Sequence, residues 1–360
     1  MPKPEKGKIS VQLPEDLAEL LLKWYDRAKR DLPWRDAPGP YGVWVSEIML
    51  QQTRVETVKD YYVRFLAELP AVEDLAMADE EKLMKLWQGL GYYSRVRNMA
   101  AAAKKIMSEH NGNFPRNWQE IRDLPGIGDY TAGAIASIAF GLPEPAVDGN
   151  VVRVLARLTG QGNDDGIWRT AFAEALRSRY PAGRCGDFTQ SLMELGATVC
   201  LPNGAPHCGE CPLNCKCRAL SENRIGELPG KKVKTPRKIC EMTVFVILNR
   251  ARDQILLKKR GTTGLLAGLW ELPHTARHEK DVAAVRTAAA AAAGVSDCGI
   301  LSLDPLPVKT HIFTHIEWRM RPYLVVCDAA ELSGGVPLDQ LSAAYPLPVA
   351  FSKVLPDGLL

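Results

Sequence analysis

The sequence has no apolar run of the roughly 18 to 20 residues that a membrane-spanning helix requires. Its start, MPKPEKGKIS, also lacks the apolar core of a signal peptide. A strong charge of either sign is absent too, because 45 basic and 42 acidic side chains give a formal charge of +3. We therefore expect a cytoplasmic protein that contacts no membrane, and any basic face that binds nucleic acid must be local.

The cysteines are not spread along the chain, as the disulfide framework of a secreted protein would require. Five of the nine lie within the eighteen residues 200–217, which indicates a metal site. The C-x7-C-x2-C-x5-C spacing favours a [4Fe-4S] cluster over zinc, which more often takes two C-x2-C pairs or histidines. The expected ligands are Cys200, Cys208, Cys211 and Cys217, with Cys215 as a spare thiol.

Length and periodicity predict two domains, because 360 residues exceed the roughly 100 to 200 of one ordinary domain. Residues 14–220 show apolar positions at helical spacing, whereas residues 239–360 change to strand patterns around one alanine-rich helix at 283–295. Residues 221–238 carry six basic and two acidic residues without an apolar period. We expect an all-α domain over 1–220, a solvated linker over 221–238, and an α/β domain over 239–360.

The stretch LPGIG at 124–128 joins two predicted helices, WQEIRDL and YTAGAIASIAF. Gly126 and Gly128 would let backbone amides approach a phosphate, and the second helix would direct its positive N-terminus the same way. Such a hairpin can hold a DNA strand without reading its bases. The alternative is an ordinary helix connection with glycines for turn geometry.

Two carboxylates stand out. Glu47 lies in the apolar stretch VWVSEIML, so that it either holds a proton or has a partner, unless it is a first-turn residue stabilised by the helix dipole. Asp148 precedes the amphipathic stretch VVRVLARL, where an Asp or Asn is a good N-cap, and the same structural role is open to Asn150. A protonated, buried Glu47 and an ionised Asp148 at an exposed helix start would form the acid and anion pair that cleaves a bond to a sugar.

Several motifs, in order along nearly the whole chain, resemble those of the MutY-type adenine DNA glycosylases of the endonuclease III superfamily. They are LPWR at 32–35, VWVSEIMLQQTRV at 43–55, GLGYYSRVRN at 89–98, LPGIGDYTAGAI at 124–135, PAVDGNVVRVLAR at 145–157, the cysteines, and GLLAGLWELP at 264–273. The resemblance implies a helix-hairpin-helix glycosylase domain with a [4Fe-4S] loop and a Nudix-like domain. It further implies a nucleoid-associated monomer that removes adenine mispaired with 8-oxoguanine or guanine in double-stranded DNA.

The resemblance also implies roles for single residues. Glu47 matches the acid that protonates adenine at N7 and then serves the attacking water. Asp148 matches the carboxylate that stabilises or captures the sugar cation, and Asn150 and Tyr130 match residues that position it. Further matches line the adenine pocket or enter the DNA stack, although the aromatic ones could equally be helix core: Arg30, Leu32, Trp34, Arg35, Gln52 and Tyr92.

Tyr130 stands where related bifunctional glycosylases have a lysine that forms a Schiff base with the sugar. Because a phenol cannot form an imine, we expect an abasic product without strand cleavage. Two alternatives stay open, an endonuclease III-like glycosylase with lyase activity and an iron-sulfur DNA-binding protein without catalysis. Tyr130 and the Nudix-like domain argue against the first.

In the C-terminal domain, Arg286 is followed by TAAAAAAGV where a Nudix hydrolase has metal-binding glutamates, so pyrophosphate hydrolysis is not expected. The family's lesion-recognition loop usually reads Phe-Ser-His, and here it reads Phe313-Thr314-His315. Threonine keeps a hydroxyl but adds a methyl group, which can alter discrimination of the lesion. A zinc site at His311 and His315 is a rival reading that lacks a nearby cysteine.

The cysteine loop departs from the family pattern, because seven residues rather than the usual six precede Cys208. A shifted register would make Cys215 a ligand in place of Cys217. The loop also offers only His207 where the family carries a basic residue toward DNA phosphates. Weaker binding to the DNA backbone is expected unless basic residues elsewhere contribute, the possibilities being Arg95, Arg97 and Lys216.

Overall fold

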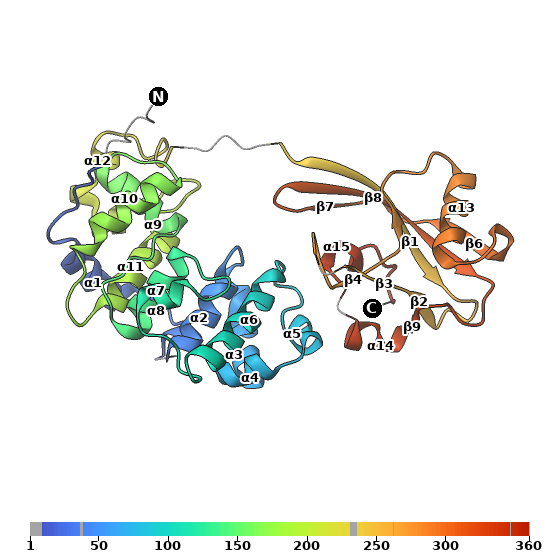
Figure 1. The fold of residues 1–360 in the computed structure, drawn as a ribbon. Coiled ribbons are helices and arrows are strands. Elements are labelled where there is room, and N and C mark those ends of the chain that lie inside the picture. Colours follow the sequence, from blue (N-terminus) through green and yellow to red (C-terminus); the bar gives the residue numbers. More distant parts are fainter. Residues whose placement is uncertain (1–8, 37–38, 231–235, 262, 346, 360) are drawn as a thin grey trace, which may run out of the picture. The chain divides into compact units, whose positions relative to one another are not determined.

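The computed structural model describes residues 9–36, 39–230, 236–261, 263–345 and 347–359. The chain divides into two compact units, one of Met1–Ala78 with Arg97–Val233 and one of Lys234–Leu360 with Asp79–Val96 (Figure 1). The first is helical and the second is built mainly on a sheet, which confirms the predicted classes, all-α followed by α/β. The predicted domain bounds themselves stay a prediction. In the described part of the chain, no helix is long and apolar enough to cross a membrane.

The N-terminal region up to residue 230 consists of helices joined by short turns. In chain order they are α1 (Leu17–Ala28), η1 (Pro33–Arg35), α2 (Gly39–Leu50), α3 (Val55–Glu68), α4 (Val72–Met77), α5 (Glu80–Leu86), α6 (Ser94–Glu109), α7 (Trp118–Arg122), α8 (Asp129–Phe140), α9 (Gly149–Thr159), α10 (Gly166–Arg177), α11 (Cys185–Thr198), η2 (Cys208–Glu210), η3 (Asn214–Lys216) and α12 (Arg218–Ser221). Helix α8 packs between α2 and α11, and α11 also contacts α9 and α1. These contacts bring together five helices from different parts of the sequence.

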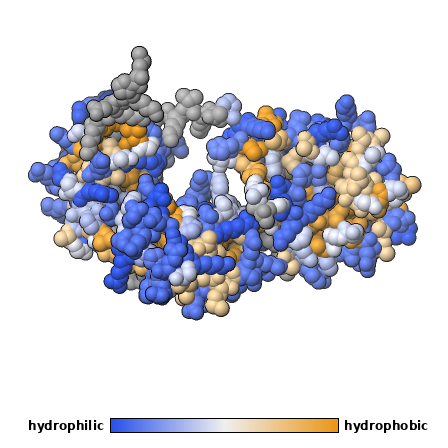
Figure 2. All heavy atoms as spheres, viewed as in Figure 1, coloured by the Kyte–Doolittle hydropathy of each residue, from blue (hydrophilic) through white to orange (hydrophobic). Residues whose placement is uncertain are grey.

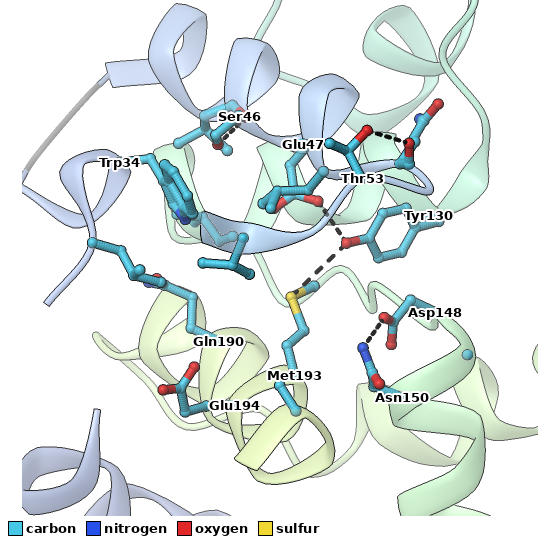
Figure 3. A pocket seen from close by; sticks show the side chains of 18 of the residues that line it. Trp34, Ser46, Glu47, Thr53, Tyr130, Asp148, Asn150, Gln190, Met193 and Glu194 are labelled. Atoms are coloured by element: carbon cyan, nitrogen blue, oxygen red, sulfur yellow. Dashed lines mark hydrogen bonds between the residues drawn. The ribbon is translucent and has the colours of Figure 1, made fainter. Parts of the chain in front are cut away.

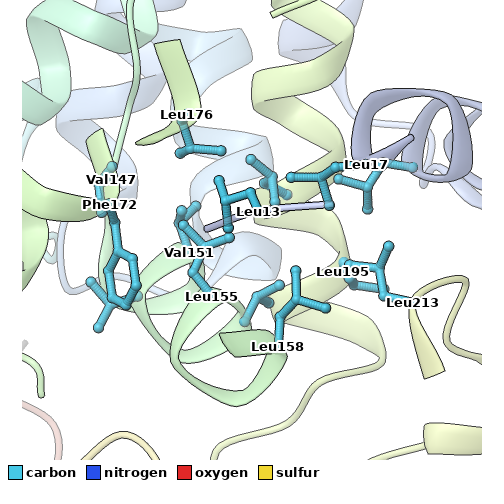
Figure 4. Packing of buried hydrophobic residues seen from close by; sticks show 14 of the residues in the cluster. Leu13, Leu17, Val147, Val151, Leu155, Leu158, Phe172, Leu176, Leu195 and Leu213 are labelled. Atoms are coloured by element: carbon cyan, nitrogen blue, oxygen red, sulfur yellow. The ribbon is translucent and has the colours of Figure 1, made fainter. Parts of the chain in front are cut away.

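A hydrophobic cluster anchors α9 and α11 beneath that space (Figure 4). Val151 and Leu155 of α9 are fully buried against Leu195 of α11 and Leu17 of α1. Burying a side chain of this size contributes about 1.5 to 3 kcal/mol. The cluster therefore holds α9 and α11 rigidly in place.

On the face that Figure 2 shows, hydrophobic residues at the surface are interspersed among hydrophilic ones.

Helix α8 passes very close to the segment that leads into α9. A Cβ atom on Gly133 would lie 2.1 Å from the carbonyl oxygen of Pro145, a distance that no side chain tolerates. Glycine is therefore required at this crossing. The close approach brings the start of α8 and the start of α9 to the same side of the unit.

The C-terminal sheet runs in the order β6-β8-β1-β2-β9, with β5 beside β1 and β7 beside β8. Its strands are β1 (Lys238–Leu248), β2 (Gln254–Leu256), β5 (His274–Thr275), β6 (Ile300–Pro305), β7 (Lys309–Ile312), β8 (Ile316–Cys327) and β9 (Gly335–Pro337), while β3 (Lys258–Lys259) pairs with β4 (Trp270–Glu271) separately. Strands β1 and β8 are parallel along their length, from Lys238 opposite Ile316 to Leu248 opposite Val326.

Helices cover both faces of this sheet, and the remaining short helix of the unit is η4 (Asp297–Gly299). Val244 and Val246 of β1 face a core that includes residues of α14 (Leu338–Ala344) and α15 (Val349–Ser352), whereas Phe245 and Ile247 face α13 (Val282–Ala293). The alternating burial expected of these strands is thus replaced in β1 by a continuous buried run, as is usual for a central strand covered on both sides.

The first half of the predicted linker is not a free solvated segment. Leu228 is buried, and its carbonyl accepts a hydrogen bond from Arg157 Nε of α9 at 3.1 Å. The amide of Gly230 donates to the carbonyl of Gly162 at 3.1 Å. The prediction of a solvated linker from residue 221 was wrong for this part, since a segment without an apolar period can still make backbone contacts with the helical unit. Residues 231–235 lie outside the described residues.

Candidate active site

A pocket of about 610 Å³ opens between α2, α8, α9 and α11 (Figure 3). Its lining includes Glu47 from α2, Tyr130 from α8, Asp148 and Asn150 at the start of α9, and Met193 from α11. The sequence places the first four of these in separate motifs, and the structure brings them together. The volume is large enough for a nucleobase together with its sugar.

Glu47 is buried, with 6% of its surface exposed, and stands in the third turn of α2. The first-turn alternative for this residue is therefore wrong. Burial raises the pKa of Glu47 to about 7, the negative charge of Asp148 adds to the rise, and a hydrogen bond from Tyr130 opposes it. A carboxyl in this position holds a proton near neutrality that it can give away.

The Tyr130 hydroxyl donates to Glu47 Oε2 at 2.5 Å and lies 4.0 Å from Met193 Sδ (Figure 3). No hydrogen bond joins Tyr130 to Asp148 within the described residues, so that positioning of Asp148 by Tyr130 stays a prediction. Burial raises the pKa of Tyr130 well above 10, so the phenol stays neutral and keeps its proton for the carboxyl.

Asp148 is the N-cap of α9, as its position before the amphipathic stretch suggested, and it lines the pocket as well. One carboxylate oxygen accepts from the Val151 amide at 2.8 Å and the other from Asn150 Nδ2 at 2.8 Å. The sequence predicted an exposed helix start at Asp148. In the structure this position is partly buried. Burial accordingly raises the pKa of Asp148, against the two hydrogen bonds and the charge of Arg153, which favour the ionised form.

Arg153 connects this capped carboxylate to the cysteine loop, a role that the sequence did not reveal. Its guanidinium donates to Asn150 Oδ1 at 2.9 Å, to the carbonyl of Gly196 at 2.8 Å and to the carbonyl of Cys200 at 2.7 Å. Asn150 is therefore held from both sides, by Asp148 and by Arg153. Its spacing of three residues from Asn150 on one helix was the available signal.

The four expected pocket residues Arg30, Leu32, Trp34 and Arg35 all line the pocket. Glu194 of α11, which the sequence reading missed, binds both arginines, at 2.7 Å from Arg30 Nε and 2.8 Å from Arg35 Nη2. Although burial alone raises the pKa of Glu194, these hydrogen bonds lower it to about 2. The buried ion pairs hold one wall of the pocket in place.

The two residues expected to enter a DNA stack differ in position. Gln52 lines the pocket, whereas Tyr92 is not among the lining residues and is 48% exposed. Both adopt left-handed backbone conformations, with φ of 57° and 47°. Such a conformation is uncommon outside glycine and typical of sharp turns that present a side chain.

The hairpin forms as predicted between α7 and α8. Gly126 has φ of 77°, and a Cβ atom there would lie 2.6 Å from the Cβ of Asn98, so glycine is required. Gly128 is the N-cap of α8, and a Cβ there would meet nothing within 4 Å. The start of this 12-residue helix is thus open to an approaching anion.

Four of the clustered cysteines line one small cavity, namely Cys200, Cys208, Cys211 and Cys217, whereas the exposed Cys215 does not. Burial raises the pKa of Cys211 to about 11. Among the described residues, no three metal-binding side chains converge on a single ion position. The four thiols around one cavity could hold a metal ion or a metal cluster.

Two of the basic residues considered as substitutes for a loop lysine have other partners. Arg95 is buried and donates to the carbonyls of Leu90 and Gly91 at 3.0 Å, and burial lowers its pKa to about 10. The suggestion that Arg95 binds a DNA phosphate is therefore wrong, because its side chain is buried and already bound to backbone carbonyls. Lys216 binds the carboxylate of Asp16 at 2.6 Å on the surface. Arg97 is half-buried on α6.

In the second unit, Phe313-Thr314-His315 forms the turn between β7 and β8. The Phe313 ring packs edge-on against Trp318 at 4.9 Å and against His311 at 4.6 Å, while Thr314 and His315 are exposed at the tip. In α13, Arg286 donates to the carbonyls of Asp297 and Ile300. The alanines that follow it supply no oxygen ligands for magnesium.

Chemically, the pocket combines a protonated carboxyl, Glu47, with a second carboxylate, Asp148, that two hydrogen bonds from Val151 and Asn150 keep in place. A proton donor and an anion on one base-sized space can cleave an N-glycosidic bond, since the base leaves as a protonated ring and the sugar becomes a cation. The lining offers no lysine for imine formation.

Comparison with known proteins agrees with this geometry. Residues 45–177 match the HhH-GPD superfamily of base excision DNA repair proteins, and residues 243–357 match the NUDIX domain. The chain is thus a helix-hairpin-helix base excision repair protein with a NUDIX domain. It is 36% identical over 377 residues to the adenine DNA glycosylase of Mus musculus, covering 88% of this chain and 72% of that protein. The chain belongs to the adenine DNA glycosylase family.

Other relatives extend the comparison. The adenine DNA glycosylase of Arabidopsis thaliana is 40% identical over 365 residues. The match covers 88% of this chain and 57% of the length of that relative. Among solved structures, a thermostable thymine-DNA glycosylase superposes with a TM-score of 0.51 at 29% identity, over 57% of this chain and 95% of that one. A trapped endonuclease III–DNA complex, at 24% identity and a TM-score of 0.51, shows the same fold over 59% of this chain and 99% of its own.

Replacing Glu194 with glutamine tests the ion pairs of the pocket wall. Because the folded-state pKa of about 2 lies below the ordinary 4.5, the carboxylate stabilises the fold fully above pH 4.5 and progressively less as the pH falls toward 2. We expect Glu194→Gln to lower the free energy of unfolding by about 3 kcal/mol at pH 7. The difference from the unchanged protein should narrow below pH 4.5 in denaturant titrations.

Glu56→Gln is the matched control, because Glu56 pairs with Lys59 at 3.1 Å on the surface with 78% of its side chain exposed. It should change stability by less than about 1 kcal/mol. Equal effects of the two substitutions, or a Glu194→Gln effect that does not depend on pH, would contradict the assignment.

Proposed function

We propose that the protein removes adenine paired with 8-oxoguanine or guanine in duplex DNA, hydrolysing the N-glycosidic bond and leaving an abasic site. The observation that carries the proposal is the meeting of Glu47 and Asp148 in one base-sized pocket, with the pKa of Glu47 raised to about 7 partly by the charge of Asp148. The charge of Asp148 favours the protonated form of Glu47, which is the form that can donate a proton. Membership of the adenine DNA glycosylase family supports the choice of base.

In this mechanism the adenine nucleotide leaves the stack and its base enters the pocket. Glu47 donates its proton to N7, which makes adenine a neutral leaving group, and the C1′–N9 bond breaks with its electrons on the base. Asp148 then stabilises or captures the deoxyribosyl cation, with Asn150 and Arg153 holding its carboxylate. The Glu47 carboxylate finally accepts a proton from the water that attacks C1′.

Tyr130 supports a monofunctional enzyme. It is a neutral phenol bound to Glu47, and the pocket lining holds no amine that could attack C1′. Without a Schiff base the sugar is not activated for strand cleavage. The product is therefore an intact strand with an abasic site, which separates this function from a glycosylase with lyase activity.

DNA binding is assigned to the hairpin and the pocket mouth. Amides around Gly126 and Gly128 at the start of α8 suit a backbone phosphate. Gln52 and Tyr92, held in left-handed conformations, are the side chains proposed to enter the stack. In the second unit, Phe313, Thr314 and His315 are proposed to recognise the oxidised guanine, with the Thr314 hydroxyl as the hydrogen-bonding group.

The cysteine loop is proposed to hold a [4Fe-4S] cluster through Cys200, Cys208, Cys211 and Cys217. The four sulfurs around one cavity fit such a group, and Arg157 donates to Cys200 Sγ at 3.3 Å, as suits a thiolate. When bound, the cluster would supply cross-links that order the loop. The chain's own contribution is Arg153, which ties the carbonyl of Cys200 to Asn150.

The central test is an excision assay on a duplex with one A:8-oxoguanine pair. The unchanged protein should give strand breaks only after heating in alkali, because alkali opens abasic sites. Glu47→Gln should slow base release by about 100-fold or more while binding of the duplex persists, since an amide cannot donate the proton. Strand breaks without alkali would instead indicate a lyase, and no breaks at all a protein that only binds DNA.

The pH dependence of excision tests the Glu47–Tyr130 bond. Because Glu47 must be protonated, the single-turnover rate should fall as the pH rises through about 7. Tyr130→Phe removes the hydrogen bond that lowers the pKa of Glu47, so the midpoint of this fall should move to higher pH. A midpoint that stays in place or moves to lower pH rules out the assigned donor role of Tyr130.

Substitution of single cysteines tests the ligand set. Cys217→Ser should remove bound iron and sulfide, measured per mole of protein, because Cys217 lines the cavity. Cys215→Ser is the matched control and should leave both unchanged, because the exposed Cys215 does not line the cavity. The reverse outcome would show the shifted register, and zinc in the purified protein would overturn the cluster.

A further inference from the structure

The pocket lining includes three arginines, and they differ in what holds them. Arg30 and Arg35 are both bound to the carboxylate of Glu194, whose side chain is only 1% exposed. Arg169 of α10 instead pairs with Asp164, and the two side chains are 36% and 41% exposed. An exchange of partners is therefore costly for the first two arginines and cheap for the third, since an exposed ion pair contributes little.

Arg169 also lies at a defined end of the pocket. Its Nη1 donates to the carbonyl of Val147 at 3.0 Å, one residue before Asp148. Arg30 and Arg35 line the pocket together with Leu32 and Trp34, and both are bound to Glu194 of α11. The guanidinium of Arg169 is thus held against the backbone that leads into Asp148, and it lines the same pocket.

A charge requirement arises at this end. The sugar next to Asp148 carries a phosphate on each side, so that anions approach a pocket already lined by the carboxylate of Asp148. Asp148 has a raised pKa and no cation of its own other than Arg153 behind it. A cation at the rim would offset the repulsion between Asp148 and these phosphates.

We propose that Arg169 binds a phosphate that flanks the deoxyribose of the excised nucleotide, exchanging Asp164 for that phosphate when DNA enters. Asp164 keeps the guanidinium extended in the free protein, and the bond to Val147 keeps it beside Asp148 in both states. The inference rests on the proposed function and adds a backbone contact to it. It also supplies a positive charge that the stretch between Cys200 and Cys208, with only His207, does not offer.

The test combines a protein variant with a neutralised phosphate. Binding is measured to a duplex with 2′-fluoro-deoxyadenosine opposite 8-oxoguanine, because the fluorine disfavours the sugar cation and prevents turnover. For the unchanged protein, a methylphosphonate at one of the two flanking positions should weaken binding about tenfold at low salt. For Arg169→Gln the same substitution in the DNA should have no further effect.

Salt dependence and rate give independent readouts. Arg169→Gln should reduce the slope of log affinity against log salt by about 1, and Arg169→Lys should restore it. Asp164→Asn should strengthen binding, because it removes the competing anion. Because the proposed phosphate contact acts on binding, Arg169→Gln should lower the affinity for the duplex by a larger factor than it lowers the single-turnover excision rate at saturating protein.

Arg177→Gln is the matched control. Arg177 lies on the same helix and pairs with Glu144 at 2.8 Å, but it does not line the pocket. It should leave the effect of the methylphosphonate unchanged. The proposal is overturned if Arg169→Gln still senses the neutral linkage, or if it lowers the saturated rate without changing affinity, which would mean that Arg169 only supports the backbone before Asp148. Failure of the proposed function is distinct, because then the unchanged protein releases no adenine.

Discussion

The site depends on one electrostatic constraint, the burial of Glu47 within reach of the negative charge of Asp148. Desolvation and the neighbouring charge both disfavour a second anion, and so the pair shares its charge unequally. Tyr130 donates a hydrogen bond to Glu47, which opposes the resulting rise and leaves the pKa of Glu47 at about 7. The fold serves the constraint by crossing α8 against the segment before α9 at Gly133, where no larger residue fits.

Much of this could be predicted from the sequence because the local signals were strong. The turn at Gly126, the N-cap at Asp148 and the buried run around Glu47 each depend on neighbours within a few residues, and the motifs placed them in a known family. Glu194 and Arg153 escaped notice because their partners are distant in the chain, and an isolated charged residue in an amphipathic helix looks like a solvated one. Arg95 was considered as a phosphate contact for a similar reason. The sequence does not show that its side chain is buried and bound to the carbonyls of Leu90 and Gly91.

Helix α9 organises the helical unit along its length. Its first turn presents Asp148 and Asn150 to the pocket, its middle sends Arg153 to Gly196 and Cys200, and its last turns send Arg157 to Cys200 and Leu228. The buried side chains of Val151 and Leu155 fix this helix in the hydrophobic core, so that its first turn, its middle and its last turns keep their positions relative to one another. Order in the cysteine loop and order in the catalytic carboxylate are therefore properties of one rigid element.

The burial of Arg95 has a consequence for how damage to this protein would present itself. The guanidinium bonds the carbonyls of Leu90 and Gly91 and stacks on the rings of Trp87 and Tyr92, at 5.2 and 5.7 Å from their centres. It is thus an internal brace for the loop that presents Tyr92. In a sequence comparison, a substitution of Arg95 would look like the loss of a DNA-binding charge. Its effect would instead be the loss of the contacts that support the loop carrying Tyr92, and that effect would not depend on ionic strength.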